Sequence, residues 1–372
     1  MIADFVDFGL ERLLSTWENR VQYNLSESGV RSLPTRALLD AAGVDELVDA
    51  ELNYPQSNGP AVLRERIAAL YTNAGPENVL VTVGAAQANF TAFVALTQPG
   101  DALAVMQPNY QQFWGLAQNF GRRLSTFDLR PERDWQLDRD ELARSATAAT
   151  KFVAVVNPNN PTGRILSPQE RRDIIEATAA AGAWLLADEV YAGTEHAGDA
   201  VTPSFYGEYE RTLAVGSLSK AYGLPGLRIG WIVGPAEIID RLWAWQDYVT
   251  IGAGMLDSRL AAIALQPEVR AALIQRARNY VRSGFANVAR WVAARAEVEV
   301  VPPHAGAICF VKYRQAINSS ELARRLIEEQ STLVAPGDLF GSDGYLRVSF
   351  GLPDDYVNEG LRRIGEELDK LR

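Results

Sequence analysis

From about residue 61 onward, the apolar residues switch repeatedly between helical spacing and short β-rich runs. Residues 78–83 form one such run, Asn-Val-Leu-Val-Thr-Val, and a helical pattern over residues 85–97 follows it directly. Neighbouring parallel strands need a crossover segment, which is usually a helix, so this alternation is typical of a mostly parallel sheet covered by helices. The sequence therefore predicts an α/β fold.

The alternating region predicts six strands, at residues 78–83, 102–106, 151–157, 183–187, 212–216 and 229–233. The helical patterns around them cover residues 61–71, 85–97, 111–120, 168–181 and 236–247. Six strands are enough for one large domain, which we expect to extend over residues 46–265.

A different pattern follows residue 265. A long helical stretch precedes short strands and two further helices, at residues 268–296, 297–301, 307–312, 319–329, 345–350 and 354–370. This order is typical of a smaller α+β domain. Residues 1–45 are too few and too mixed in pattern to fold alone, so we expect the small domain to comprise residues 1–45 plus 266–372.

The charge balance disfavours two kinds of partner. The chain has 36 Lys plus Arg and 46 Asp plus Glu residues, a net charge of -10 at pH 7, which is unfavourable for binding nucleic acid or anionic membranes. It contains no run of about 18 apolar residues, and Asp4, Asp7 and Glu11 stand where a signal peptide needs a basic start and an apolar stretch. We expect a cytoplasmic protein that spans no membrane.

The rare residues exclude two further classes. The single cysteine, Cys309, cannot form an internal disulfide, so the chain is not a disulfide scaffold. The two histidines, His196 and His304, lie far apart in the sequence and have no ligand spacing around them. No metal site is expected.

The most informative segment is residues 217–231, Ser-Leu-Ser-Lys-Ala-Tyr-Gly-Leu-Pro-Gly-Leu-Arg-Ile-Gly-Trp, which follows a predicted strand. Serine hydroxyls and a guanidinium, here Arg228, are good phosphate ligands. The lysine beside them, Lys220, could form a Schiff base with an aldehyde that carries a phosphate. A polar loop with a surface lysine is the alternative interpretation of so short a motif.

Two further motifs follow predicted strands. The turn Asn-Pro-Asn-Asn-Pro-Thr-Gly over residues 157–163 directs the Asn160 amide beyond the carboxyl end of its strand, although it could also be an ordinary strand-to-helix turn. The strand that precedes Asp188-Glu189-Val190-Tyr191 ends in a carboxylate. A carboxylate buried there needs a cationic or protonated partner, whereas an exposed one would be a helix N-cap.

The motifs N-P-x-N-P-T-G, D-E-x-Y and S-x-S-K, with an arginine eight residues after the lysine, occur in an order that resembles the class I/II aminotransferases, which are fold-type I pyridoxal-phosphate enzymes. The resemblance covers roughly residues 45–370 and includes Tyr54 with Gly59, Leu63-Arg64, residues 84–88, residues 336–341 and residues 345–349. It implies a large domain whose sheet is sandwiched by helices, a pyridoxal 5'-phosphate cofactor, an L-amino acid and a 2-oxo acid as substrates, and a homodimer.

The resemblance also assigns roles around the cofactor. Lys220 would carry the cofactor as a Schiff base and move the proton at Cα. Asp188 would keep the pyridine nitrogen protonated, while Tyr191 and Asn160 would hydrogen-bond the 3'-oxygen. The phosphate would be bound by the side chains of Arg228, Ser217 and Ser219 and by the backbone N–H groups of Ala85 and Ala86 at a helix N-terminus.

Three aromatic or cationic residues complete the implied site. Tyr110 matches the position whose ring stacks on the cofactor, although a core tyrosine is an equally good interpretation. Tyr54 matches a loop that reaches the phosphate in the other subunit of a dimer. Arg347 resembles the arginine that binds the substrate α-carboxylate, and on a predicted strand a cation there must face a cavity or an anion. Asn160 and Gly29 are the other expected substrate contacts.

The segment over residues 23–30, Tyr-Asn-Leu-Ser-Glu-Ser-Gly-Val, lacks the G-x-P-D run that is usual at this place. Its S-x-S-G-V pattern is similar to that of capreomycidine synthases, which use this fold to cyclise a hydroxylated arginine. Glu27 is therefore a candidate partner for a cationic substrate, and a polar loop that lines any substrate is the alternative.

Three functions remain open at this point. The first is an aminotransferase, and the second is a pyridoxal-phosphate-dependent lyase or cyclase that expels a β- or γ-substituent. A catalytically silent binding module is disfavoured because Lys220 and Asp188 are both present. A nicotinamide-dependent enzyme is set aside, since no G-x-G-x-x-G follows the early strands.

Overall fold

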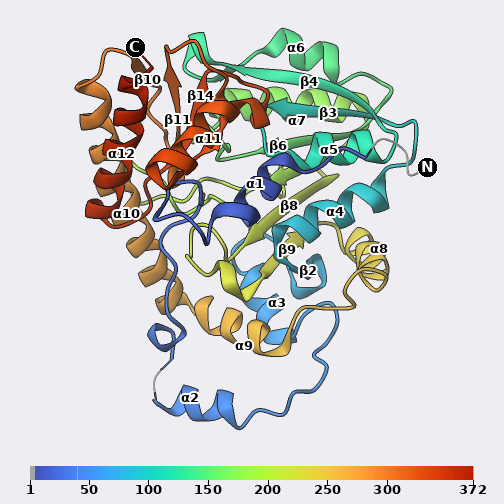
Figure 1. Cartoon of the computed structure of the whole chain (residues 1–372). Coiled ribbons are helices and arrows are strands. Elements are labelled where there is room, and N and C mark those ends of the chain that lie inside the picture. The colour runs from blue at the N-terminus through green and yellow to red at the C-terminus, as the bar shows by residue number, and fades with distance from the viewer. Residues whose placement is uncertain (1–4, 40, 372) are drawn as a thin grey trace.

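The computed structural model describes residues 5–39 and 41–371, and its largest element is an eight-stranded sheet (Figure 1). The strands lie in the order β2-β9-β8-β7-β6-β3-β4-β5. Their bounds are β2 Val79–Val83, β3 Ala102–Gln107, β4 Arg123–Arg130, β5 Gln136–Leu137, β6 Thr150–Val156, β7 Trp184–Asp188, β8 Thr212–Ser217 and β9 Ile229–Val233. Neighbours from β4 to β8 pair in parallel, while β9 and β5 pair antiparallel. The prediction of a mostly parallel sheet is confirmed.

Two strands of this sheet, β4 and β5, were not expected from the sequence. In β4 only Phe127 and Leu129 are buried, and the first half of the strand is largely exposed. It therefore lacks the continuous apolar run that marks the central strands, because it lies near an edge of the sheet.

Helices cover both faces of the sheet. The helices in this part of the chain are α3 Ala61–Ala68, α4 Gly84–Leu96, α5 Gln112–Asn119, α6 Arg139–Ser145, α7 Pro168–Ala181, α8 Ala236–Gln246 and α9 Met255–Ala264. Leu80 and Val105 pack with residues of α4, α5 and α8 on one face. On the other face, Val79 packs with residues of α3 and α9, and Ala104 with residues of α6 and α7. Side chains alternate between these layers with the period of two that a strand imposes.

A second, four-stranded sheet lies in the C-terminal part of the chain. Its order is β10-β11-β14-β13, all antiparallel, with bounds β10 Val298–Val300, β11 Ile308–Tyr313, β13 Ala335–Pro336 and β14 Tyr345–Ser349. The helices that pack on it are α10 Pro267–Ala293, α11 Ser319–Gln330 and α12 Asp354–Asp369. The strands of the two sheets fall within 79–233 and 298–349, on either side of the expected boundary at residue 265, which itself stays a prediction.

The N-terminal segment is attached to this C-terminal part. Strand β1 (Tyr23–Asn24) pairs in parallel with β12 (Thr332–Leu333), and Leu25 is buried in the core formed with α12. Helix α1 (Gly9–Trp17) lies near the middle of the molecule, whereas α2 (Ala41–Val48) lies at its lower edge in Figure 1. Among the residues that the structure describes, no helix is long and apolar enough to cross a membrane.

Candidate active site

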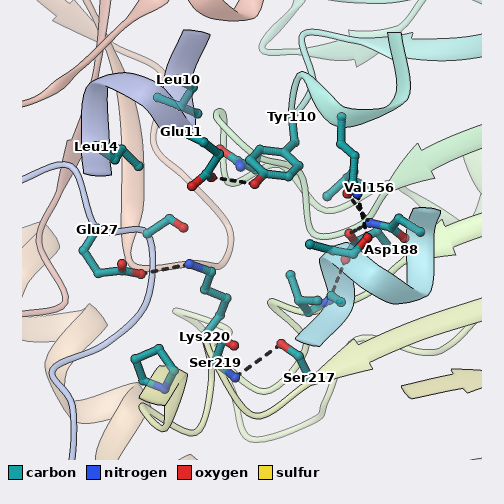
Figure 2. A pocket seen from close by; sticks show the side chains of 18 of the residues that line it. Leu10, Glu11, Leu14, Glu27, Tyr110, Val156, Asp188, Ser217, Ser219 and Lys220 are labelled. Atoms are coloured by element: carbon teal, nitrogen blue, oxygen red, sulfur yellow. Dashed lines mark hydrogen bonds and ion pairs between the residues drawn. The ribbon is translucent and has the colours of Figure 1, made fainter. Parts of the chain in front are cut away.

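A cavity of about 530 Å³ lies beyond the carboxyl ends of β6, β7 and β8 (Figure 2). Twelve of the fourteen residues proposed from the sequence line it: Glu27, Ala85, Ala86, Tyr110, Asn160, Asp188, Tyr191, Ser217, Ser219, Lys220, Arg228 and Arg347. Strand register explains this, because Val156 of β6, Asp188 of β7 and Val215 of β8 are paired neighbours. The residues that follow these positions must emerge at the same edge of the sheet.

One end of the cavity is rich in hydrogen-bond donors. Helix α4 begins there, and its N-cap residue, Val83, offers no side-chain acceptor to the first-turn N–H groups. The Arg228 guanidinium lies so close to Gly84 that a Cβ at this glycine would collide with it. Arg228 Nη1 donates to Ser219 Oγ at 3.5 Å, and the Ser219 N–H donates to Ser217 Oγ at 3.3 Å. A cation, two hydroxyls and a helix N-terminus together fit a phosphate.

The other end of the cavity holds a buried carboxylate. Burial raises the pKa of Asp188, while hydrogen bonds from Asn89 and Val190 and the charge of Lys220 oppose that rise. Asn89 Nδ2 donates to Asp188 Oδ2 at 2.9 Å, and the Val190 N–H donates to Oδ1 at 3.2 Å. A carboxylate in this position fits a protonated ring nitrogen, which would offset the cost of its burial.

Lys220 forms an ion pair with Glu27 inside the cavity, and Figure 2 shows the two side chains pointing toward one another. Lys220 Nζ donates to Glu27 Oε1 at 2.8 Å, and the same oxygen accepts the Gly29 N–H at 3.0 Å. The positive charge of Lys220 lowers the pKa of Glu27 to about 2. Burial by itself lowers the pKa of Lys220, but the attraction of Glu27 outweighs it, so the pKa is raised. In this state the amine is held protonated.

Arg347 lies on β14 and is almost fully buried. Its Nη1 donates to Asn160 Oδ1 at 2.9 Å and its Nη2 to the Ser26 carbonyl oxygen at 2.5 Å, while its Nε makes no hydrogen bond within the described residues. The guanidinium carbon lies 5.2 Å from the centre of the Phe340 ring. The planar group is thus fixed at the cavity wall, as two-point binding of a carboxylate requires.

The two tyrosines of the site are held by residues of the N-terminal segment. The Tyr191 hydroxyl donates to Ser28 Oγ at 3.0 Å. The Tyr110 hydroxyl donates to Glu11 Oε1 at 2.5 Å, a contact drawn in Figure 2, and its ring packs against Phe8. Burial raises the pKa of both tyrosines, so both phenols stay protonated.

Two residues expected at the site do not line the cavity. Gly29 lies behind it, where its N–H holds Glu27 and a Cβ would approach the Ser219 carbonyl oxygen to 3.0 Å. Tyr54 is 93% exposed and lies in the segment between α2 and α3. Its expected role depends on a second subunit and stays a prediction.

The sequence reasoning missed several lining residues: Glu11, Glu18, Ser28, Asn89 and Gln112. A signal existed for Asn89, because it lies four residues after Ala85 and so shares a helix face with the expected phosphate contact. Glu11 and Glu18 lie seven residues apart, which is two helical turns, but the N-terminal segment had no clear pattern.

The family assignment follows from comparison with known proteins. The chain belongs to the family described as Aminotransferase class I and II, which matches residues 22–364. Its cofactor is pyridoxal 5'-phosphate, and the donor-rich and carboxylate ends of the cavity fit the phosphate and the ring nitrogen of that molecule. A crystal structure of a PLP-dependent aminotransferase from Streptococcus suis has a TM-score of 0.93 at 28% identity and covers 99% of both chains.

Two curated relatives are similar over nearly the whole chain. Capreomycidine synthase from Streptomyces vinaceus is 34% identical over 351 residues, which cover 93% of this chain and 89% of the relative. Arginine–pyruvate transaminase AruH from Pseudomonas aeruginosa is 27% identical over 365 residues, which cover 95% and 92%. The chain is therefore an enzyme of this family, and the names of these two relatives describe different reactions.

We predict that borohydride reduction of the holoenzyme fixes the cofactor on Lys220, because no other lysine of the described chain lines the cavity. Peptide mapping by mass spectrometry reads out the position of the label. Lys151 and Lys312, which lie outside the cavity, serve as internal controls and should stay unmodified. A label elsewhere, or normal turnover by Lys220→Ala, would contradict the assignment.

Proposed function

We propose that this enzyme uses pyridoxal phosphate to act on an L-amino acid with a cationic, guanidinium-like side chain. The observation that supports this most is a group of three glutamates, Glu11, Glu18 and Glu27, that line the same cavity as Arg347. Burial and the repulsion of Glu27 and Glu11 raise the pKa of Glu18. A substrate cation among these carboxylates would relieve that repulsion, whereas an acidic side chain would increase it.

Arg347 and the three glutamates would bind different parts of the substrate. Arg347 is placed to bind the α-carboxylate, because its two-pronged group is already fixed by Asn160 and the Ser26 carbonyl oxygen. The carboxylates of the N-terminal segment then face the far end of the side chain. This arrangement sets both the orientation of the amino acid and its preferred charge.

The chain's own residues support the chemistry at Cα. When bound, pyridoxal phosphate supplies an aldehyde that condenses with amines and a ring that withdraws electrons from Cα. Asp188 holds a proton at the ring nitrogen. Lys220 is placed to accept the Cα proton and to return it, and Glu27, 2.8 Å from Nζ, favours the protonated amine.

Of the two reactions that this chemistry allows, we propose elimination followed by ring closure. Once Lys220 has taken the Cα proton, its ammonium can protonate a hydroxyl that leaves Cβ as water; a guanidine nitrogen then loses a proton as it bonds to Cβ, and Cα is reprotonated. The S-x-S-G-V segment, the similarity to capreomycidine synthase and the ammonium-favouring Glu27 support this reaction.

Transamination is the second candidate, and the similarity to arginine–pyruvate transaminase supports it. In that case the amino group would be transferred, through pyridoxal phosphate, to a 2-oxo acid. The acceptor must enter the same cavity, so the three glutamates favour one with a small neutral side chain over a dicarboxylate.

We also propose that the active enzyme is a homodimer. Exposed apolar residues gather beside Tyr54, where Leu52, Ile251 and Leu256 line a surface hollow with it. A second copy would cover this apolar surface and bring Tyr54 toward the phosphate end of the partner's cavity.

We predict that the holoenzyme, incubated without any oxo acid, reacts with arginine-type amino acids and much more slowly with leucine or glutamate. With an arginine hydroxylated at Cβ as substrate, mass spectrometry of the product should show the loss of water that elimination and ring closure require. The absorption spectrum should show that the cofactor stays in its aldehyde form. Accumulation of pyridoxamine phosphate instead would establish transamination. A preference for leucine or glutamate would contradict the cationic substrate.

We predict that Glu27→Gln raises KM for arginine-type substrates about tenfold relative to neutral amino acids, since one charge-assisted contact is lost. Arg347→Ala is the comparison variant and should raise KM for both groups, because the α-carboxylate is common to them. Arg347→Lys should rescue poorly. Equal effects of Glu27→Gln on cationic and neutral substrates would show that Glu27 acts only on Lys220.

We predict that mixing Tyr54→Ala with Lys220→Ala restores activity that neither variant has alone. A hybrid dimer combines an intact Lys220 from one chain with an intact Tyr54 from the other at one of its two sites, so random exchange should restore about a quarter of the wild-type activity. Native mass spectrometry verifies that hybrids have formed. Hybrids without activity, or an active monomer in dilute solution, would contradict the shared site.

A further inference from the structure

Asn89 stands out among the polar residues of the cavity because nothing in the proposed chemistry uses it. It lies on α4, lines the cavity and is only 1% exposed. Its Nδ2 donates to Asp188 Oδ2 at 2.9 Å and approaches Gln112 Oε1 at 3.3 Å. Its Oδ1 is buried and makes no hydrogen bond within the described residues. A buried polar atom left in this way is costly unless a ligand satisfies it.

The surroundings fix Asn89 in place. Gln112 on α5 accepts from Asn89 and itself donates through Nε2 to the Ala86 carbonyl oxygen at 2.6 Å. The chain of contacts therefore runs from the first turn of α4, at the phosphate end, to the carboxylate at the ring end. An amide held from both sides can orient the carboxylate that it touches.

Asp188 needs such help because it is buried and must remain an anion to hold a proton at a ring nitrogen. Besides the Val190 N–H, Asn89 is the neutral donor that contacts it. The charged or titratable side chains that act on it are Lys220, which favours the anion, and the neighbouring Glu189 and Tyr191. Among these side chains, Asn89 is the one whose hydrogen bond fixes the position of a carboxylate oxygen, Oδ2.

We propose that Asn89 is a positioning residue that holds the Asp188 carboxylate, as an anion, toward the cofactor ring. Its Oδ1, which makes no hydrogen bond within the described residues, remains available as an acceptor. This inference rests on the proposed contact between Asp188 and the ring nitrogen, and it is independent of the substrate and of the reaction.

The test compares Asn89→Leu with Asn287→Leu. Asn287 is a matched control, because it is also buried on a helix and donates through Nδ2 to an aspartate, Asp354, at 2.8 Å, but lies outside the cavity. The probes are pyridoxal 5'-phosphate and its 1-deaza analogue, in which carbon replaces the ring nitrogen. Binding of both to the apoenzymes is measured by fluorescence titration.

We predict that Asn89→Leu reduces the preference for pyridoxal phosphate over the deaza analogue by about tenfold, and that Asn287→Leu leaves the preference unchanged. The pH midpoint of the Schiff-base absorption should also move upward in Asn89→Leu. The reason is that a ring nitrogen without its proton no longer opposes a positive charge on the imine, which then stays protonated to higher pH.

The outcomes distinguish a failure of the role proposed for Asn89 from a failure of the contact proposed between Asp188 and the ring nitrogen. An unchanged preference and midpoint in a folded Asn89→Leu protein would make Asn89 merely structural. A wild-type enzyme that binds both probes equally would overturn the contact between Asp188 and the ring nitrogen, and this inference with it. Circular dichroism monitors folding, and Asn89→Ser, which removes the amide without adding bulk, replaces the leucine variant if that variant does not fold.

Discussion

The parallel register of β6, β7 and β8 is the constraint on which the rest of the site depends. It places Val156, Asp188 and Val215 side by side, so the turns that follow all begin at one edge of the sheet. The buried apolar core beneath them keeps this register, because a slip by one residue would turn each strand's side chains to the opposite faces. The phosphate end, the carboxylate end and the lysine thus have fixed separations before any ligand binds.

The cavity contains charged residues of both signs, and their charges only partly cancel. Lys220, Arg228 and Arg347 bring three cations, while Asp188 and the three glutamates of the N-terminal segment bring four carboxylates. Only part of this charge is paired, as between Lys220 and Glu27. The surplus of carboxylates agrees with the acidic net charge of the chain and is the physical basis for proposing a cationic substrate.

The N-terminal segment is attached to the C-terminal part of the chain and also contributes side chains to the cavity at the large sheet. It joins the C-terminal part through the pairing of β1 with β12, yet it supplies Glu11, Glu27 and Ser28 to a cavity built mainly at the edge of the large sheet. In this chain, the segment therefore allows substrate preference to be set separately from the proposed cofactor contacts at the edge of the large sheet.

The sequence by itself determined the α/β alternation, the strand ends and the residues proposed to bind the cofactor, because these depend on local periodicity and on short motifs. It did not determine β4, whose exposed half lacks an apolar run, or the pairing of Lys220 with Glu27, which are 193 residues apart. Nor did it show that Asn89 holds Asp188 across 99 residues. Such contacts arise only when the chain folds back on itself, since no local pattern records which distant side chains will meet.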